Sequence, residues 1–236
     1  MSSWQARALP LDRPGLPPRG TLDLWLADLT DMPLEAGPSG LTRRERVFKQ
    51  RIQQQFTLRL LLGAYLGRPG KDVRVSRDAN GKPVLAGGAA DRSLTFNLSH
   101  SGHWLAIVVA RELPVGVDIE TDRRLRRPLA MARRYFPSAD AATLDGLDEP
   151  GLSRAFLDQW TRREALVKAT GAGLSGHLGS IELRDGAPVG LPPGWTPPAE
   201  WSLLEPQWPA GLIGCVAAPR PGLTLRAHFL QTGRGH

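Results

Sequence analysis

The sequence predicts an α+β protein made of two similar halves. Two pairs of apolar segments, 94–98 with 104–110 and 201–204 with 212–217, share one strand–turn–strand rhythm. A long helical pattern lies in each half, one beginning near Thr42 and one spanning about 153–170. We therefore expect halves at 1–112 and 113–236, related by pseudo-two-fold symmetry. Each would be a small, mostly antiparallel sheet packed against a long helix.

The first half begins with a short apolar run at 22–29 that predicts a strand. Thr42 and Glu45 then fit a capping box that opens a helix. Gly67, followed by a proline two residues later, ends it. Four side chains recur at every fourth position and predict one apolar helix face: Phe48, Ile52, Phe56 and Leu60.

The remaining elements follow from short apolar runs and from turn residues. Strands are expected at 73–76, 94–98, 104–110 and 115–120, with a turn at Asn80 and Gly81. Pro128 opens a helix to about residue 136, and a longer helix over 153–170 stops at two glycines. Further strands are expected at 180–184, 201–204, 212–217 and 223–230.

Composition narrows the classes of function. The 236 residues are 41% hydrophobic, enough for a real core, and the formal charge of +7 predicts an acidic partner. That partner could be nucleic acid, an anionic membrane, a phosphate-rich ligand or an acidic protein. The single cysteine, Cys215, excludes an internal disulfide and is expected to be buried. The longest apolar run, 104–110, is too short to span a bilayer, so we expect a soluble, cytoplasmic protein.

Two carboxylates alternate with apolar residues in the strand over 115–120. Asp118 and Glu120 are two residues apart, so they share one face of that strand. Two such charges repel each other unless a cation or a basic group lies between them. The alternative is a solvated edge strand with ordinary surface acids.

The long helix over 153–170 carries a second group of polar residues. Trp160, Glu164 and Lys168 are four residues apart and therefore lie along one helix face. A simple surface pair between Glu164 and Lys168 is the alternative. The tryptophan on the same face and the Gly-x-Gly sequence directly after the helix favour a functional site.

A third motif, Phe-Asn-Leu-Ser-His-Ser, covers residues 96–101. The hydroxyl of Ser99 and the imidazole of His100 could donate hydrogen bonds to phosphate oxygens, or they could stabilise a local turn. A serine hydrolase is not expected, since neighbouring strand residues point apart and the chain has no Gly-x-Ser-x-Gly sequence.

Together, three motifs resemble the signature set of the 4′-phosphopantetheinyl transferase superfamily, in its larger single-chain type. They are Phe-Asn-Leu-Ser-His-Ser, Gly-Val-Asp-Ile-Glu and Trp-x-x-x-Glu-Ala-x-x-Lys-Ala-x-Gly-x-Gly-Leu, and the resemblance covers residues 41–183. It implies Mg²⁺-dependent transfer of phosphopantetheine from coenzyme A to a serine of an apo acyl or peptidyl carrier protein. The product would be 3′,5′-ADP.

The resemblance also implies residue roles. Asp118, Glu120 and Glu164 would bind Mg²⁺, with Glu164 the general base. Lys168 would contact the diphosphate of coenzyme A, and His100 would assist catalysis. Asp118 would reach the same diphosphate through the shared Mg²⁺ ion. Further coenzyme A contacts are expected from Arg44, Arg46, Arg59, Lys82, Ser99 and His100.

An acidic carrier protein would suit the net charge of +7. The segment over 133–136 resembles the docking region of the family, with Tyr135 or Phe136 as an anchor, although both could be core residues. The resemblance further implies a monomer that binds neither nucleic acid nor membrane.

The chain departs from the family pattern at two positions. Arg163 stands where the family commonly has lysine, and Asp140 where many members have glutamate. Four histidines match no motif: His103, His177, His228 and His236. Two rival functions remain. One is a metal-dependent phosphodiesterase or nuclease, which often uses two metals. The other is a basic nucleic-acid-binding module, which would interleave aromatic residues with its arginines.

Overall fold

The computed structural model describes residues 4–9, 11–31, 42–173 and 177–231, so Leu174 of the helix motif and His236 lie outside the described part. It confirms the α+β class. The strands are β1 (Gln5–Ala8), β2 (Thr21–Asp28), β3 (Val75–Arg77), β4 (Pro83–Leu85), β5 (Leu94–Ser101), β6 (Trp104–Arg111), β7 (Gly116–Thr121), β8 (Glu182–Arg184), β9 (Ala187–Gly190), β10 (Ser202–Leu204), β11 (Leu212–Ala218) and β12 (Thr224–Gln231). The α-helices are α1 (Arg43–Leu66), α2 (Ala89–Ser93), α3 (Pro128–Tyr135), α4 (Ser138–Ala142) and α5 (Gly151–Thr170).

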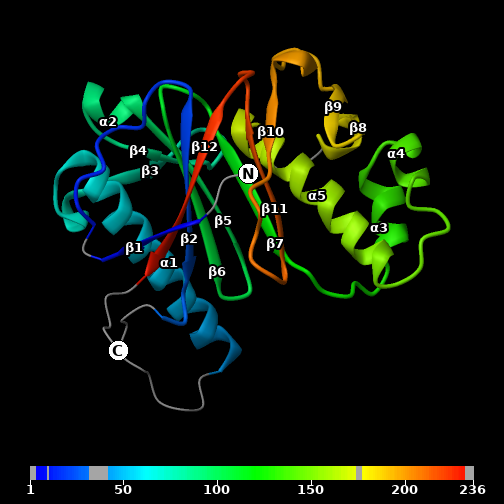
Figure 1. The fold of residues 1–236 in the computed structure, drawn as a ribbon, viewed down its shortest axis with the longest axis horizontal. Coiled ribbons are helices and arrows are strands. Elements are labelled where there is room, and N and C mark those ends of the chain that lie inside the picture. Colours follow the sequence, from blue (N-terminus) through cyan, green and yellow to red (C-terminus); the bar gives the residue numbers. More distant parts are fainter. Residues whose placement is uncertain (1–3, 10, 32–41, 174–176, 232–236) are drawn as a thin grey trace.

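Two sheets form the centre of the molecule (Figure 1). The larger has the strand order β1-β12-β2-β6-β5 and the smaller the order β10-β11-β7, while β3 pairs with β4 and β8 with β9. The pairs β1–β12 and β12–β2 are parallel, and the other pairs are antiparallel. The last strand of the chain therefore belongs to the sheet built mainly from the first hundred residues. The boundary near residue 113 and the pseudo-symmetry stay predictions.

Helix α1 begins and ends where the sequence predicts. The backbone N–H of Glu45 donates to the Thr42 hydroxyl at 3.3 Å, and the Glu45 carboxylate accepts from the Thr42 N–H at 2.7 Å. Gly67 follows the helix with a φ of 65°, a left-handed conformation that glycine adopts readily. The capping box and the glycine stop are thus confirmed.

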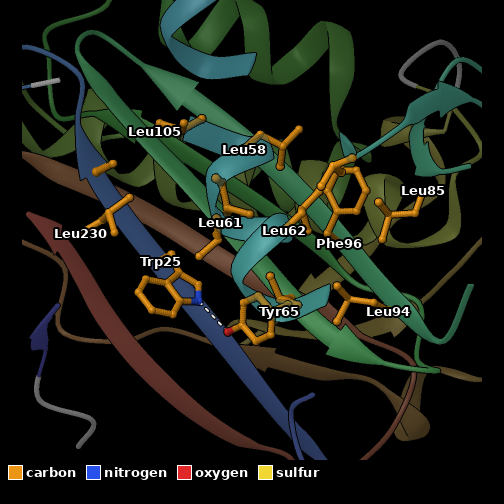
Figure 2. Close-up of a cluster of buried hydrophobic side chains, with 14 of the residues drawn as sticks. Trp25, Leu58, Leu61, Leu62, Tyr65, Leu85, Leu94, Phe96, Leu105 and Leu230 are labelled. Carbon is orange, nitrogen blue, oxygen red and sulfur yellow. Dashed lines mark hydrogen bonds between the residues drawn. The ribbon is translucent and has the colours of Figure 1, made fainter. Parts of the chain in front are cut away.

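The predicted apolar face of α1 is not the side of the helix that is buried. Phe48 is 66% exposed, and Ile52 and Phe56 are each 42% exposed. The side chains that pack against the larger sheet are instead Leu58, Leu61, Leu62 and Tyr65 (Figure 2). The reason is that only the second half of the helix lies over the sheet, whereas the first turns extend beyond the strands (Figure 1).

A buried polar network ties α1 to the larger sheet. The Tyr65 hydroxyl accepts from the Trp25 indole N–H at 2.8 Å (Figure 2). It also donates to Asp23 at 2.7 Å. Arg226 of β12 binds Asp23 through two hydrogen bonds of 2.6 and 2.8 Å. Interactions with His228, Arg226 and Tyr65, in that order of size, hold the pKa of Asp23 below its usual value in spite of its burial. The network fixes the C-terminal strand beside β2.

Replacing Tyr65 with phenylalanine should lower the free energy of unfolding by about 1–3 kcal/mol, because the indole of Trp25 loses its acceptor and Asp23 loses a donor. Urea denaturation at pH 7 measures the change. Tyr135→Phe is the matched control, since the described residues provide no hydrogen bond to that hydroxyl. Equal losses in the two variants would contradict the prediction.

Phe136 lies in the core of the second half. It is 5% exposed, stacks on Phe156 with ring centroids 5.1 Å apart, and carries the guanidinium of Arg163 at 4.1 Å from its ring centre. Tyr135 is half-buried, with its ring edge against Trp160. Of the two alternatives for Phe136, core residue or docking anchor, the structure supports the core residue.

Two further observations concern the chain as a whole. Cys215 is buried as expected, and burial raises the pKa of its thiol well above the usual value. Among the described residues, no helix combines the length and the apolar character needed to cross a lipid bilayer.

Candidate active site

Helix α5 crosses strand β7 at very short range. A Cβ atom built on Gly116 would lie 2.1 Å from the carbonyl oxygen of Ala165 and 2.5 Å from the backbone nitrogen of Ala169, so only glycine fits there. This close approach brings the helix motif onto the strand motif. The carboxylates predicted from two separate segments are neighbours for this reason.

Glu164 points from α5 into this contact and is 5% exposed. Burial raises the pKa of its carboxyl to about 7, and the negative charge of Asp118 adds to that effect. Lys168 opposes the shift only in part. Glu164 can therefore hold or release a proton near neutral pH.

Asp118 is also buried and has three neighbours that bear on its charge. Its Oδ1 atom accepts hydrogen bonds from the Lys168 ammonium at 2.7 Å and from the Ser99 hydroxyl at 2.8 Å. Burial raises the pKa of Asp118 in spite of these partners, and Glu120 contributes in the same direction. The Oδ2 atom is buried with no hydrogen-bond partner among the described residues.

Glu120, the second acid of β7, has partners of its own. Its carboxylate accepts from the Ser101 hydroxyl and from the guanidinium of Arg123, each at 2.7 Å. In the described part of the chain, no three His, Cys, Asp or Glu side chains lie close enough together to hold a metal ion as they stand. Each strand acid is instead paired with a basic side chain, Asp118 with Lys168 and Glu120 with Arg123. These pairs offset the repulsion between the two neighbouring carboxylates.

Strand β5 holds β7 in place through side chains, at the boundary between the two sheets. The backbone N–H groups of residues 117, 119 and 121 donate to side-chain oxygens of β5 at 3.0, 3.3 and 2.9 Å. The acceptors are Asn97, Ser99 and Ser101. They alternate along β5, so all three lie on one face of that strand. Sequence reasoning missed Asn97 and Ser101, although polar residues at every second position of an apolar strand were the available signal.

A cleft of about 790 Å³ opens beside the acids, between α1, the β3–β4 hairpin, β5 and the end of α5. Four basic side chains line it, which suits a ligand with phosphate groups: Arg51, Arg77, Lys82 and Lys168. Of the residues predicted to contact coenzyme A, Lys82 and Lys168 line this cleft. The others do not: Arg44, Arg46, Arg59, Ser99, His100 and Asp118. Arg51 and Arg77 line it without having been predicted.

His100 follows Ser99 at the end of β5, with an exposed side chain. Partial desolvation and then the positive charge of Lys168 lower the pKa of its imidazole. Asp118 and Glu120 act in the opposite direction, which places His100 near the acids. Ser99 itself points at Asp118 and acts on the carboxylate.

The ammonium of Lys82 binds the chain itself. It donates to the carbonyl oxygens of Lys168, Ala169 and Val115 at 2.6, 3.2 and 3.3 Å. A cation at this place stabilises the C-terminal end of α5. Burial lowers the pKa of Lys82 to about 8. Lys82 therefore joins the hairpin of the first half to the helix that carries Glu164.

Arg163 and Asp140, the two residues that depart from the family pattern, contact each other. Arg163 is fully buried and forms an ion pair with Asp140, which also accepts the backbone N–H of Leu183 at 2.9 Å. Arg163 donates in addition to the carbonyl oxygens of Ile181 and Gln159. Burial lowers the pKa of Arg163 to about 10, and Asp140 opposes that shift. The pair supports α5 one residue before Glu164.

An α+β scaffold with two buried acids, Asp118 and Glu164, beside a basic cleft is the arrangement expected of an enzyme that acts on a phosphate-containing substrate. Two family profiles match the chain. The one described as the 4′-phosphopantetheinyl transferase superfamily covers residues 114–206. The one described as the N-terminal part of 4′-phosphopantetheinyl transferase covers residues 44–112.

Curated relatives agree with these profiles. The 4′-phosphopantetheinyl transferase HetI of Nostoc sp. is 33% identical over 78% of this chain and 78% of its own length. The transferase psf-1 of Bacillus pumilus is 38% identical over 49% of this chain and 47% of its own, and Sfp of Bacillus subtilis is 33% identical over 48% of each. The chain belongs to the 4′-phosphopantetheinyl transferase superfamily and is an enzyme of the Sfp-like type, which confirms the resemblance seen in its motifs.

Proposed function

We propose that this enzyme transfers the 4′-phosphopantetheine group of coenzyme A to the serine of an apo acyl or peptidyl carrier protein. The reaction would require Mg²⁺ and release 3′,5′-ADP. The observation that carries the proposal is the position of Glu164, a buried carboxyl with a pKa near 7, against Asp118 and beside a cleft lined by basic residues. The family of the chain and the names of its relatives support it.

Asp118, Glu120 and Glu164 would hold the magnesium ion after their side chains move together, since they form no three-ligand cluster as they stand in the described part of the chain. Carboxylate oxygens are the ligands that Mg²⁺ prefers, and Asp118 Oδ2 is a buried oxygen without a partner in the described part of the chain. Burial raises the pKa of both Asp118 and Glu164, and the neighbouring carboxylates add to each shift. A divalent cation would offset that negative charge. When bound, the ion would neutralise charge on the diphosphate.

The side chains of the site have distinct parts in the transfer. Glu164 accepts the proton of the carrier serine, whose oxygen forms a bond to the β-phosphorus of coenzyme A. The bond from that phosphorus to the bridging oxygen breaks, and 3′,5′-ADP leaves with the electron pair. Lys168 and His100 stabilise the negative charge that develops on the phosphate oxygens. Ser99 and Ser101 keep the acids of β7 in position.

Coenzyme A would occupy the 790 Å³ cleft, with its phosphates near Arg51, Arg77 and Lys168. Lys82 would support this site by holding the end of α5. Arg59 lies at an adjoining cleft, and Arg44 and Arg46 lie outside both. The carrier is an acidic protein that the net charge of +7 attracts. We further propose a cytoplasmic monomer without affinity for nucleic acid or membranes. The two halves would meet near residue 113, where one family profile ends and the other begins.

Incubation with coenzyme A and apo carrier proteins tests this function. We expect the carrier to gain the mass of one phosphopantetheine group when Mg²⁺ is present and to gain nothing in EDTA. Carriers from fatty-acid, polyketide and nonribosomal-peptide synthesis should be tried in parallel. Cleavage of DNA or RNA with no modification of any carrier would support the nuclease alternative instead. Salt-sensitive binding to generic DNA without affinity for coenzyme A would support the nucleic-acid-binding alternative.

A further inference from the structure

Two hydrogen-bond donors lie on the side of α1 that faces the candidate active site. Arg51 and Gln54 are three residues apart, and Leu58 lies four residues after Gln54, so the three share one side of the helix. Leu58 is fully buried against the larger sheet, so this side of α1 faces the body of the protein. Arg51 and Gln54 both line the basic cleft of about 790 Å³, whereas the arginines of α1 that the family resemblance implies do not.

The side chain of Gln54 lacks a hydrogen-bond partner for its donor. It is 8% exposed, and its amide nitrogen is buried with no partner in the described part of the chain. Most buried polar groups in proteins are hydrogen-bonded, because a buried donor without an acceptor costs free energy. The last side-chain torsion of glutamine is broad, so the amide can turn toward an acceptor that enters the cleft. An acceptor on a bound ligand would therefore satisfy this group.

Arg51 is available to a ligand, whereas the other basic side chains of the cleft already have partners within the protein. Arg77 donates to a backbone carbonyl oxygen of its own hairpin at 2.6 Å. Lys82 donates to three backbone carbonyl oxygens, and Lys168 is paired with Asp118 at 2.7 Å. Arg51 forms no hydrogen bond or ion pair with any residue that the structure describes. Its guanidinium can therefore bind a phosphate group without breaking an existing contact.

Coenzyme A would bring two kinds of phosphate into this cleft, a diphosphate and a 3′-phosphate on the ribose. In the proposed function the diphosphate lies at the acids, beside Lys168 of α5. Arg51 and Gln54 come from α1, which forms a different wall of the cleft. The 3′-phosphate is a monoester with about two negative charges near pH 7 and three terminal oxygens that accept hydrogen bonds. A guanidinium and an amide one helical turn apart suit such a group.

We propose that Arg51 and Gln54 bind the 3′-phosphate of coenzyme A and thereby select coenzyme A over dephospho-coenzyme A, which lacks that group. This inference rests on the proposed function and assigns the contact to two residues that the sequence motifs did not indicate. Arg51 supplies charge-assisted hydrogen bonds, and Gln54 supplies a second donor on the same side of the helix. A contact of these residues with the diphosphate would instead affect both co-substrates alike, because both contain it.

The test compares the two co-substrates at saturating Mg²⁺ and saturating carrier protein. For the wild type, we expect the KM for coenzyme A to be lower than that for dephospho-coenzyme A by about tenfold or more, since hydrogen bonds to a charged group contribute that much to affinity. The KM for coenzyme A should rise about tenfold in Arg51→Met and about threefold in Gln54→Met. The KM for dephospho-coenzyme A should change less than about twofold in either variant.

Two further variants serve as controls. Arg220→Met removes the same charge from an exposed arginine that lines neither cleft, so both KM values should stay within about twofold of the wild type. Arg51→Lys keeps the charge but loses the planar pair of donors, so it should retain part of the preference for coenzyme A. Circular dichroism and the melting temperature verify that all variants fold.

The outcomes separate this inference from the proposed function. A wild-type enzyme that modifies no carrier with coenzyme A overturns the proposed function and the inference with it. Normal wild-type transfer with equal KM values for the two co-substrates overturns the inference alone. An equal rise of both KM values in Arg51→Met also overturns it, since the residue would then act on the diphosphate or on the fold.

A binding measurement checks the same point without catalysis. The nucleotides 3′,5′-ADP and 5′-AMP differ only in the 3′-phosphate, and isothermal titration calorimetry measures the affinity of each. The wild type should bind 3′,5′-ADP about tenfold or more tightly than 5′-AMP, and Arg51→Met should lose most of that difference. A difference that survives in Arg51→Met would contradict the assignment.

Discussion

A Glu164→Gln substitution is expected to reduce carrier modification by about 10³-fold or more while the fold stays intact. Glutamine has nearly the shape of glutamate, so packing at this buried position is preserved. It cannot accept the proton of the carrier serine, and it removes one of the three negative charges proposed to bind Mg²⁺. The measurement is the initial rate of holo-carrier formation by mass spectrometry at saturating coenzyme A. A rate within tenfold of the wild type would remove Glu164 from the mechanism.

Glu164→Gln can also be tested by its free energy of unfolding, because the raised pKa of Glu164 makes the stability of the wild type depend on pH. In the unfolded chain the carboxyl titrates near 4.5, and in the folded chain near 7. Between these values the folded chain binds more protons, so the metal-free protein should lose stability as pH rises from about 4.5 to 7. The loss should reach at most about 3 kcal/mol at pH 8.

Glu164→Gln carries no such titration. In EDTA at pH 8 it should therefore be more stable than the wild type, although it is inactive. Urea denaturation at pH 5 and pH 8 measures the effect, and Glu182→Gln is a control at an exposed glutamate outside the acid cluster. Equal stability of wild type and Glu164→Gln at both pH values would contradict the assigned pKa shift.

The sequence was sufficient to predict the acids of the site and the elements that bear them. Asp118 and Glu120 are two residues apart on a strand, and Glu164 and Lys168 are four apart on a helix. Local periodicity therefore predicts that the members of each pair point to the same side of their element. Gly116 of the strand motif marks the place where helix and strand meet. Periodicity does not predict which other element packs against a given face of a helix or strand. Phe48, Ile52 and Phe56 form a regular apolar face, but which face of α1 meets the sheet depends on where the helix crosses it.

Contacts between distant segments account for the other differences. Lys82 was expected at the nucleotide because the resemblance to the family implies a nucleotide-binding lysine at that position. In the structure it binds carbonyl groups of α5, a contact across 86 residues that no local pattern reveals. Asn97 and Ser101 act on the backbone of β7 in the same way. Such contacts bring the strand acids and the helix acid together.

The ion pair between Arg163 and Asp140 is the clearest case, since the two residues are 23 positions apart and each departs from the family pattern. The pair is buried and multiply hydrogen-bonded, so the loss of either member leaves an uncompensated charge in the core. We expect Arg163→Met and Asp140→Leu each to lower the free energy of unfolding by about 3–5 kcal/mol.

The double variant Arg163→Met/Asp140→Leu separates the charge from the packing. Replacing a whole buried pair with apolar side chains is often neutral or stabilising, so the double variant should recover most of the stability that each single variant loses. A double-mutant cycle by urea denaturation measures the coupling between the two residues. Losses that simply add would show that each residue acts through its own packing. Recovery of stability with a reduced rate of transfer would mean that the buried pair positions α5, and with it Glu164, for the reaction.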